Sequence, residues 1–365
     1  MPKYIYEYDQ WPDFTWDEKK IQSLLGKVRY MQGKILGRIG MLGFREQAET
    51  YLDNLSRDIV KSFEIEGEKL DLAQVRSSIA RKLGLEYGGM VHPDRHIDGI
   101  TEMMLDATRH YDRPLTEERL FGWHAALFPT GYSGNYKIEV AQYRSAPMQI
   151  VSGAFGKQKV HYVAPPPGRV KPEMDRFIEW FNTDQTMDDV IKSAVAHLRF
   201  VIIHPFDDGN GRIARALSDM LLARADDSPE RFYSLSSQIL KDRKNYYAVL
   251  QKVQHSNSDI TEWLEWYLQT LYNALKETDK ALDDTLFKIK LWEKHKETEL
   301  NARQRLMLNK LLDGFTGKLK TSKWAKMAKC SQDTALRDIT DLIEKGILKK
   351  ENAGGRSTSY VLVRD

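Results

Sequence analysis

The sequence predicts a mainly α-helical fold with one short β-rich interruption, and three observations support this prediction. Apolar residues recur at helical spacing along most of the chain, most clearly over residues 44–65 and 188–203. Residues 136–163 change to the alternating, β-rich pattern of strands. Residues 297–365 combine short amphipathic segments with β-rich runs at their end. We therefore expect helices to form the core, with a small hairpin set into it.

Composition is typical of a globular protein with more than one domain. The chain has 365 residues, of which 41% are hydrophobic and 29% charged, enough for two or three domains with cores of their own. No apolar run approaches the roughly 20 residues needed to span a bilayer, and the N-terminus has no signal-peptide layout. The single cysteine, Cys330, excludes an internal disulfide framework. We expect a cytoplasmic protein without a membrane partner.

Charge is distributed unevenly. The net charge is +3, yet residues 301–365 hold 14 Lys and Arg against 7 Asp and Glu. The basic excess therefore lies at the C-terminal end. This end is the first place to look for a nucleic-acid contact.

The N-terminal region is expected to form an aromatic arm and three helices. Residues 6–16 are rich in aromatic side chains that can pack against the body. Thr15 and Glu18 form a capping-box pattern that opens the first helix, and Gly84 can end the third. His92 and His96 have the spacing of a metal-binding pair, but Pro93 argues against a helix there, so we interpret this stretch as a linker.

One short stretch, residues 204–215, concentrates side chains that together suit phosphate chemistry. His204 can accept a proton, Asp208 can hold Mg²⁺, and Arg212 and Arg215 lie three apart on one helical face. The glycine-containing turn between two helices can aim backbone N–H groups and a helix N-terminus at one point. Each part alone is commonly structural, but the combination predicts an anion-binding site.

This stretch reads HPFDDGNGRIAR and resembles the signature of Fic proteins, HPFx(D/E)GNGRxxR, at every specified position. The resemblance implies transfer of AMP from ATP to a hydroxyl side chain of a target protein, with release of pyrophosphate. It therefore implies ATP as substrate, Mg²⁺ as cofactor and a target protein with a Ser, Thr or Tyr hydroxyl as partner.

Carried over by position, the resemblance implies a role for each residue of the signature. His204 would be the general base, and Asp208 would bind the Mg²⁺ that bridges the α- and β-phosphates. Arg212 would hold phosphates and Arg215 the γ-phosphate, with Phe206 as a buried anchor. The anion hole would be formed by Gly209, Asn210 and Gly211.

A second short motif, SFEIEG, ends the helix expected over residues 44–65. By itself it is an ordinary helix end. Beside the complete signature it resembles the inhibitory motif (S/T)xxxE(G/N) of Fic proteins, with Ser62, Glu66 and Gly67 at the specified positions. The resemblance implies that Glu66 pairs with Arg215 and takes the space and countercharge of the γ-phosphate of ATP. It also implies a homodimer that controls this helix.

The β-rich runs over residues 136–163 predict a hairpin. In Fic proteins the corresponding hairpin is a flap that clamps the target's segment by main-chain pairing. The alternative is a plain hairpin whose aromatic side chains only pack. The nucleotide contacts that the resemblance implies on the flap are Val160, His161, Tyr162 and Val163.

The helix expected over residues 240–254 carries paired tyrosines. Such tyrosines usually belong to a core, and this alternative stays open. Their spacing after the signature resembles that of the family's tyrosines on the adenine and ribose side. The nucleotide contacts implied on this helix are Tyr246, Tyr247 and Gln254.

The C-terminal residues predict three helices, over 303–312, 321–329 and 331–345, and then β-rich runs with a glycine-rich tip at 352–356. This order resembles a winged helix, in which Ser331 would cap the recognition helix. Winged helices contact DNA or proteins, and acidic residues on the third helix leave both alternatives open.

The leading prediction is an autoinhibited protein adenylyltransferase that can also modify itself. Its fold is a helical Fic (Fido) core with a small β-hairpin flap, an N-terminal helical regulatory region and a C-terminal winged-helix domain. One alternative is a winged-helix DNA-binding regulator with an ATP-sensing Fic domain. Another is a Fic enzyme that moves UMP, phosphate or phosphocholine, or that removes AMP. The predicted domains are 1–96 (regulatory), 97–258 (catalytic), 259–296 (connecting) and 297–365 (winged helix).

Overall fold

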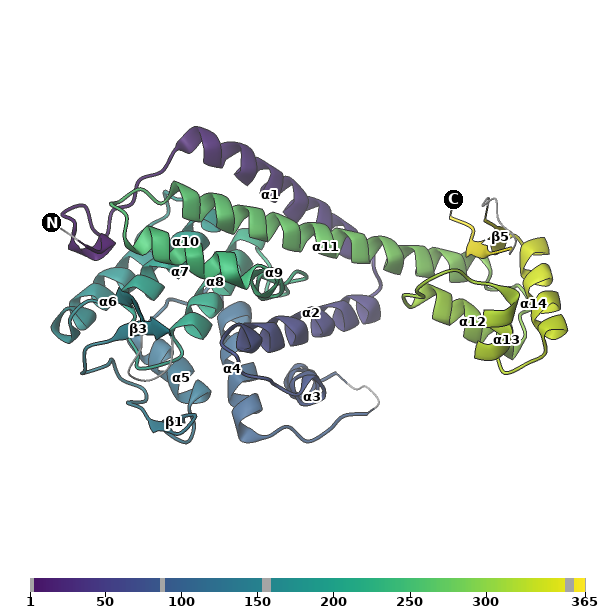
Figure 1. Cartoon of the computed structure of the whole chain (residues 1–365), viewed down its shortest axis with the longest axis horizontal. Coiled ribbons are helices and arrows are strands. Elements are labelled where there is room, and N and C mark those ends of the chain that lie inside the picture. The colour runs from purple at the N-terminus through teal and green to yellow at the C-terminus, as the bar shows by residue number, and fades with distance from the viewer. Residues whose placement is uncertain (1–2, 86–88, 153–158, 352–357, 365) are drawn as a thin grey trace. The chain divides into compact units, whose positions relative to one another are not determined.

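The computed structural model describes residues 3–85, 89–152, 159–351 and 358–364 (Figure 1). The chain divides into two compact units, Met1–Asp279 and Lys280–Asp365. Within the described residues, helices dominate both units and the strands form two-stranded antiparallel pairs. The predicted fold class, mainly α-helical with a small hairpin, is therefore confirmed. No helix among the described residues is both long enough and apolar enough to cross a membrane.

The first unit contains most of the elements (Figure 1). Its helices are η1 (Ile5–Glu7), α1 (Glu18–Ile39), α2 (Phe44–Ile65), α3 (Leu72–Leu83), α4 (Arg95–Arg109), α5 (Glu117–Leu127), α6 (Pro167–Thr183), α7 (Asp189–Ile203), α8 (Asn210–Asp226), α9 (Leu235–Lys241), α10 (Arg243–Gln254) and the start of α11 (Thr261–Lys294). Its strands are β1 (Tyr132–Ser133), β2 (Tyr136–Lys137), β3 (Gln149–Ser152) and β4 (Lys159–Val163).

Helices α7 and α8 form the centre of the first unit. Every residue of α7 from Val190 to Ile203 is buried, and most of α8 is buried as well. Two polar side chains of α11 satisfy groups inside this core. Trp263 Nε1 donates to the carbonyl oxygen of Ala194 at 2.9 Å, and the Tyr267 hydroxyl lies 2.9 Å from the Ser193 hydroxyl. A helix buried on all sides gives the turn that follows it a rigid support.

Helix α2 is fixed to the body by a buried carboxylate. Asp58, 5% exposed, accepts hydrogen bonds from the Ser234 hydroxyl (2.6 Å) and from the backbone N–H (3.1 Å) and hydroxyl (3.1 Å) of Ser236. Ser234 is the N-cap of α9, so a negative charge lies at the positive end of that helix. The end of α2 is thereby held at a defined position relative to the core.

Two helix starts differ from the sequence prediction. The first helix is capped by Asp17, whose side chain accepts from the N–H groups of Lys19 and Lys20, and not by Thr15. Thr15 is instead engaged through its backbone, with its N–H donating to the Ser258 carbonyl at 2.9 Å. Helix α4 starts at Arg95, capped by Asp94, so the stretch expected to be a linker is partly helical.

Helix α6 starts at Pro167, four residues after the hairpin strand β4 ends. Proline suits the first turn of a helix because the N–H that it lacks would have no partner there. The helix also anchors the aromatic arm, since Trp11 Nε1 donates to Glu173 Oε2 at 2.9 Å.

The second unit has its own core and continues from the end of α11. Its elements are α12 (Ala302–Leu312), α13 (Thr321–Met327), α14 (Gln332–Glu344), β5 (Leu348–Lys350) and β6 (Tyr360–Leu362). The core is built around fully buried Trp324, Met307 and Ile339. The side chain of Ser331 accepts a hydrogen bond from Thr334 N–H and caps α14. The glycine-rich tip predicted at 352–356 lies outside the described residues.

Candidate functional site

The turn between α7 and α8 is held by the side chain of Asn210. Its Oδ1 accepts from the N–H of Phe206 at 3.0 Å, and its Nδ2 donates to the Phe206 carbonyl at 2.8 Å. The Phe206 ring is fully buried and stacks on His124, with ring centroids 4.2 Å apart. Gly209 has a φ of +81°, which a residue with a side chain rarely adopts. The amide of Asn210 thus serves the turn itself, and the N–H groups of the first turn of α8 have no intrahelical acceptor.

His204 lies at the end of α7 in the left-handed region, with a φ of +52°. Its Nδ1 lies 3.1 Å from the Val201 carbonyl, which can only accept, so Nδ1 carries the proton. Burial lowers the pKa of His204 to about 4, and the imidazole is neutral at pH 7. The other ring nitrogen, Nε2, is therefore a free base in the pocket that His204 lines.

Two arginines of α8 lie beside this base, almost removed from water. Arg212 is 2% and Arg215 is 1% exposed. Nε of Arg212 and Nη1 of Arg215 are buried with no acceptor among the described residues. A buried guanidinium with an unused donor is suited to bind an anion, because a second set of acceptors can complete its hydrogen bonds.

Residues at the end of α2 contact the guanidinium of Arg215. Arg215 Nη2 lies 2.9 Å from Glu66 Oε1, while Arg215 Nε donates to the Ser62 hydroxyl at 2.7 Å and Nη2 also donates to the Ser62 carbonyl at 2.8 Å. The Tyr247 hydroxyl donates to Glu66 Oε2 at 3.4 Å. A Cβ on Gly211 would meet the tip of the Glu66 side chain, so the carboxylate would have to shift to make room for a larger residue. The contact between Glu66 and Arg215 that the inhibitory motif suggested is present.

A second carboxylate of the same segment was not anticipated. Glu68 Oε1 lies 2.7 Å from Arg212 Nη1. The chain reaches this position because Gly67 adopts a φ of +88° directly after α2. The motif resemblance ends at Gly67, and a single charged residue in a loop gives no sequence signal of its partner.

Asp208 offers one carboxylate to the same region. Its side chain is 40% exposed, accepts from the Gly209 N–H at 2.6 Å, and lies 3.3 Å from Arg212 Nη2. The Ser133 hydroxyl of β1 also donates to it. Among the described residues, no three His, Cys, Asp or Glu side chains are grouped to hold a metal ion. A cation here would have Asp208 as its protein ligand and would take its other oxygens from phosphates and water, which is the usual coordination of Mg²⁺.

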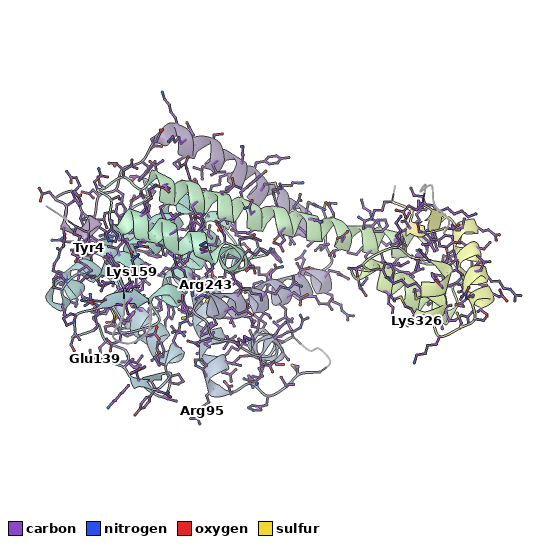
Figure 2. All side chains as sticks on the ribbon, viewed as in Figure 1. Tyr4, Arg95, Glu139, Lys159, Arg243 and Lys326 are labelled. Carbon is purple, nitrogen blue, oxygen red and sulfur yellow. The ribbon has the colours of Figure 1, made fainter. Side chains whose placement is uncertain are left out.

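Most of the signature lines one pocket of about 660 Å³, whereas Arg215 does not line it and contacts Glu66, which does. The motif contributes His204, Asp208, Gly209, Asn210, Gly211 and Arg212, and the segments around it contribute Glu66, Ile150, Val151, His161, Tyr246, Tyr247 and Gln254. Arg243 and Lys244, at the start of α10, were not predicted and also line it. Arg243 is labelled in Figure 2.

Of the four flap residues predicted to contact the nucleotide, His161 lines the pocket. Ile150 and Val151 of the partner strand β3 line it too, whereas Val160, Tyr162 and Val163 do not. Tyr162 is fully buried, and its hydroxyl donates to the Ile202 carbonyl at 2.8 Å. The alternation of side chains along a strand turns Tyr162 into the core when His161 faces the pocket.

The two tyrosines of α10 occupy different surroundings. Tyr247 is 41% exposed, whereas Tyr246 is 2% exposed and its hydroxyl lies 2.9 Å from Nε2 of His197. Tyr246 therefore combines the core position with a place in the pocket wall. Its contact with a nucleotide stays a prediction.

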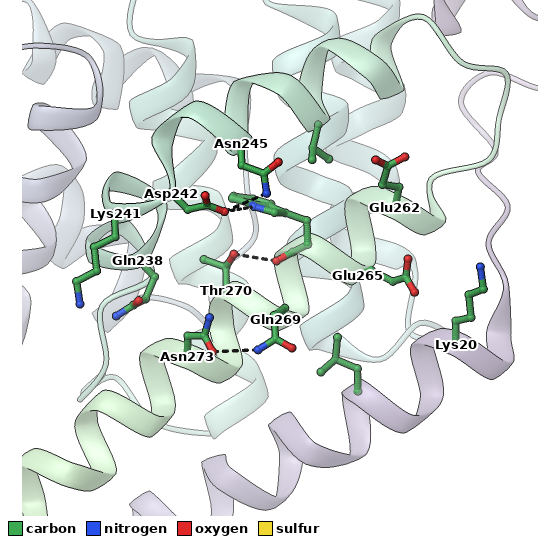
Figure 3. Close-up of a pocket in the computed structure, with 13 residues that line it drawn as sticks. Lys20, Gln238, Lys241, Asp242, Asn245, Glu262, Glu265, Gln269, Thr270 and Asn273 are labelled. Carbon is green, nitrogen blue, oxygen red and sulfur yellow. Dashed lines mark hydrogen bonds between the residues drawn. The ribbon is translucent and has the colours of Figure 1, made fainter.

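A second hollow of about 650 Å³ lies between α1, α9, α10 and α11 (Figure 3). Its polar side chains are paired with one another. Asp242 accepts from Trp266 Nε1 at 3.0 Å and from Asn245 Nδ2 at 3.1 Å, and Gln269 donates to Asn273 at 2.9 Å. None of the signature residues lines this hollow.

Comparison with known proteins gives two family matches. Residues 114–222 match the Fic/DOC family, and residues 4–85 match a domain of unknown function, DUF4172. The protein adenylyltransferase Fic of Drosophila yakuba is 30% identical over 58% of this chain and 39% of its own length. The probable protein adenylyltransferase aq_aa38 of Aquifex aeolicus is 29% identical over 37% of this chain and 38% of its own length. The chain thus spans about two fifths of these relatives.

Among solved structures, a Fic family protein from Desulfovibrio desulfuricans G20 aligns over 95% of this chain and 96% of its own, with a TM-score of 0.54 and 21% identity. A Fic domain containing signaling protein from Bacteroides thetaiotaomicron aligns over 72% of this chain and 98% of its own, with a TM-score of 0.51 and 21% identity. Both share the fold.

The histidines around the turn predict acid sensitivity. Burial lowers the pKa of His124 and His204 to about 4 and that of His197 to about 3, below the ordinary 6.5. Between pH 6.5 and 4 the unfolded chain binds these protons and the folded protein does not, so stability is lost as the pH falls through this range. We expect a lower free energy of unfolding at pH 5 than at pH 7, measured by urea denaturation.

One histidine can contribute up to about 1.4 kcal/mol per pH unit. The variant His124→Gln should therefore lose less stability between pH 7 and pH 5 than the parent. An equal loss of unfolding free energy in both proteins would show that His124 does not contribute to the acid sensitivity.

Proposed function

Because residues 114–222 are a Fic/DOC family domain, we propose that this chain transfers AMP from ATP to a hydroxyl side chain of a target protein. The target hydroxyl oxygen attacks the α-phosphorus and gives its proton to Nε2 of His204. The bond between the α-phosphorus and the bridging oxygen to the β-phosphate breaks, and pyrophosphate leaves. The proposal rests on the pocket that joins the neutral imidazole of His204 to the buried guanidinium of Arg212, with Arg215 behind the Glu66 carboxylate that also lines this pocket.

The charges of the pocket suit a triphosphate. Arg212 and Arg215 are proposed to hold the β- and γ-phosphates, and Asp208 to hold Mg²⁺, which neutralises phosphate charge when bound. The first-turn N–H groups of Gly211 and its neighbours are proposed to complete the anion hole. The base and ribose are proposed to lie against Tyr246, Tyr247 and Gln254, which line the same pocket.

The flap is proposed to position the target. Antiparallel pairing joins β3 to β4, and Val151 and Val160 are 38% and 43% exposed on this hairpin. An extended segment of a target protein can add to such an edge through main-chain hydrogen bonds. This would bring its hydroxyl within reach of His204.

We further propose that the protein is autoinhibited in the state described. A phosphate cannot occupy the Glu66 side of Arg215 while the carboxylate is there, since two anions would compete for one guanidinium. The ion pair between Glu66 and Arg215 is not an ordinary surface contact, because Arg215 is 1% exposed and also donates a hydrogen bond to the Ser62 hydroxyl. A homodimer that controls α2, and a cytoplasmic setting, are part of this proposal.

Removing the inhibitory carboxylate is the direct test. We expect Glu66→Gly to raise the incorporation of label from [α-³²P]ATP into protein, itself included, at least about tenfold, which corresponds to about 1.4 kcal/mol of relieved competition. Glu66 is the C-cap of α2, where glycine is well tolerated. Mass spectrometry of the labelled protein should find added AMP.

Two variants serve as controls. Glu64→Gln changes a carboxylate of the same helix end that pairs with Lys61 and not with the arginines, and it should leave labelling unchanged. His204→Ala in the Glu66→Gly background should abolish labelling. If Glu66→Gly labels no faster than the parent, the inhibitory role is refuted. Labelling with UMP or phosphate, or loss of AMP from a modified protein, would instead support one of the other Fic chemistries.

A second candidate function concerns the second unit, which we propose to be a winged helix. Three helices followed by the antiparallel pair β5–β6 support this assignment. DNA contact is the candidate role, because Lys349 and Lys350 are exposed on β5 and the C-terminal residues are basic. An ATP-sensing DNA-binding regulator would use the same surface.

We expect the full-length protein to retard a nonspecific DNA duplex in electrophoresis at low salt, and the double variant Lys349→Glu, Lys350→Glu to lose this retardation. Binding should weaken as salt is raised, because phosphate contacts release counterions. Absence of any retardation at low salt would exclude the DNA role and leave protein contact as the function of this unit.

A further inference from the structure

The last carbonyl groups of α7 are satisfied by side chains and not by the helix. The end of a helix leaves such carbonyls without intrahelical donors. Here the Val201 carbonyl faces Nδ1 of His204 at 3.1 Å, and the Ile202 carbonyl accepts from the Tyr162 hydroxyl at 2.8 Å. The carbonyl of His204 itself accepts from Nε of Arg144 at 2.7 Å. The conformation of His204 therefore depends on groups outside α7.

Arg144 contacts the last two of these carbonyls, that of His204 and, at 3.5 Å from Nη2, that of Ile203. Its guanidinium also donates to the carbonyls of Pro165 (2.6 Å) and Ala146 (3.0 Å), and its backbone N–H donates to the Pro205 carbonyl at 2.9 Å. The side chain is 2% exposed, and in the part of the chain that the structure describes no carboxylate forms an ion pair with it. A cation at a helix C-terminus is favoured by the helix dipole.

We propose that Arg144 is a positioning residue that fixes His204 for proton transfer and joins it to the flap. Pro165 lies two residues after the end of β4, so one guanidinium connects the end of the flap to the turn that carries His204. This inference rests on the proposed AMP transfer for its kinetic consequence. Its geometric part does not.

Because Arg144 is charged, its removal should change the pKa of His204, and a residue that only packs would not have this effect. The charged groups that influence His204 are Arg144, which lowers its pKa, and Asp208 and Glu66, which raise it, in addition to burial, which lowers it most. Removing the guanidinium therefore raises the pKa of His204. Replacing it by lysine keeps the charge but loses the fork of donors to the backbone carbonyls.

The test is an NMR titration of the histidine rings, with His204 assigned by the loss of its signal in His204→Ala. In Arg144→Met the His204 signal should titrate at higher pH than in the parent. In Arg144→Lys it should titrate near the parent value. The matched control is Arg199→Met, which removes a different buried arginine, one that belongs to α7. The Cζ atom of Arg199 lies 5.8 Å from the ring centroid of Phe177 and 5.2 Å from that of Trp180. This variant should leave the titration unchanged.

The kinetic arm uses the Glu66→Gly background. Arg144→Met and Arg144→Lys should both lower kcat about 100-fold, the scale of a misplaced catalytic group, with KM for ATP little changed. An unmoved titration in Arg144→Met, or an equal shift in Arg199→Met, would overturn the inference. Absence of AMP transfer in Glu66→Gly itself would refute the proposed function, while the titration would still decide the role of Arg144.

A second inference rests on a different contact, the one between Glu68 and Arg212. The Arg212 guanidinium lies between the rings of Phe63 and Phe128, at 5.1 and 4.9 Å from their centroids. The stacking limits where the guanidinium can move, and its edge is left for an anion. In the state described, Glu68 Oε1 occupies that edge at 2.7 Å.

We infer that Glu68 is a second competing carboxylate, so that the segment after α2 offers one carboxylate to each arginine of the signature. Glu66 then occupies the position of one phosphate and Glu68 that of another. Because Glu68 is 43% exposed, its effect should be smaller than that of Glu66. This inference deepens the proposed autoinhibition and rests on it.

Calorimetric binding of ATP with Mg²⁺ to proteins that carry His204→Ala tests this without turnover. In the Glu66→Gly background, adding Glu68→Gln should tighten ATP binding about two- to fivefold, the range expected for a half-exposed ion pair. Adding Glu64→Gln should change nothing. Equal affinity in the Glu68→Gln and Glu64→Gln proteins would overturn the inference, whereas absence of any ATP binding would refute the proposed function itself.

Discussion

Two guanidinium groups buried beside a turn are the constraint on which this structure depends. Arg212 and Arg215 are almost inaccessible to water, and a buried cation is costly unless an anion or several acceptors face it. Among the described residues, the core pairs Arg212 with one carboxylate, Asp208. The other anions come from a distant part of the sequence, through Glu66 and Glu68 just after α2. The end of α2 and the turn between α7 and α8 are therefore linked by ion pairs.

The burial of Arg212 and Arg215 also leaves donors for a ligand in a site that is already paired. Glu66 and Glu68, just after α2, pair with the arginines, while Nε of Arg212 and Nη1 of Arg215 have no acceptor in the part of the chain that the structure describes. Under the proposed function, a polyphosphate would satisfy these donors and replace the carboxylates. The hydrogen bonds of Asp58 hold α2 against α9. Competition between a carboxylate and a phosphate for one guanidinium is thus the switch that the proposed autoinhibition requires.

The parts of this site that local sequence patterns encode could be predicted. The signature predicts His204 and the arginines together because their spacing is fixed along one turn and one helix, and Phe44–Ile65 has a periodicity that gives both of its ends. The role of Asn210 in the anion hole stays a prediction, and the signature alone does not show that its side-chain amide closes the turn on Phe206, four residues earlier. Glu68 and Arg144 were missed because no local pattern marks their contacts. Their partners, Arg212 and the carbonyls around His204, are distant in sequence.

A structure of Glu66→Gly with Mg²⁺ and a nonhydrolysable ATP analogue tests the central claim most directly. We expect an oxygen of the γ-phosphate to take the position of the Glu66 carboxylate on Arg215. The distance from this oxygen to the guanidinium nitrogen should be roughly 2.9 Å, which is typical of a charge-assisted hydrogen bond. We also expect the α-phosphorus to lie beside Nε2 of His204. A triphosphate bound away from Arg215, with that guanidinium unchanged, would contradict it.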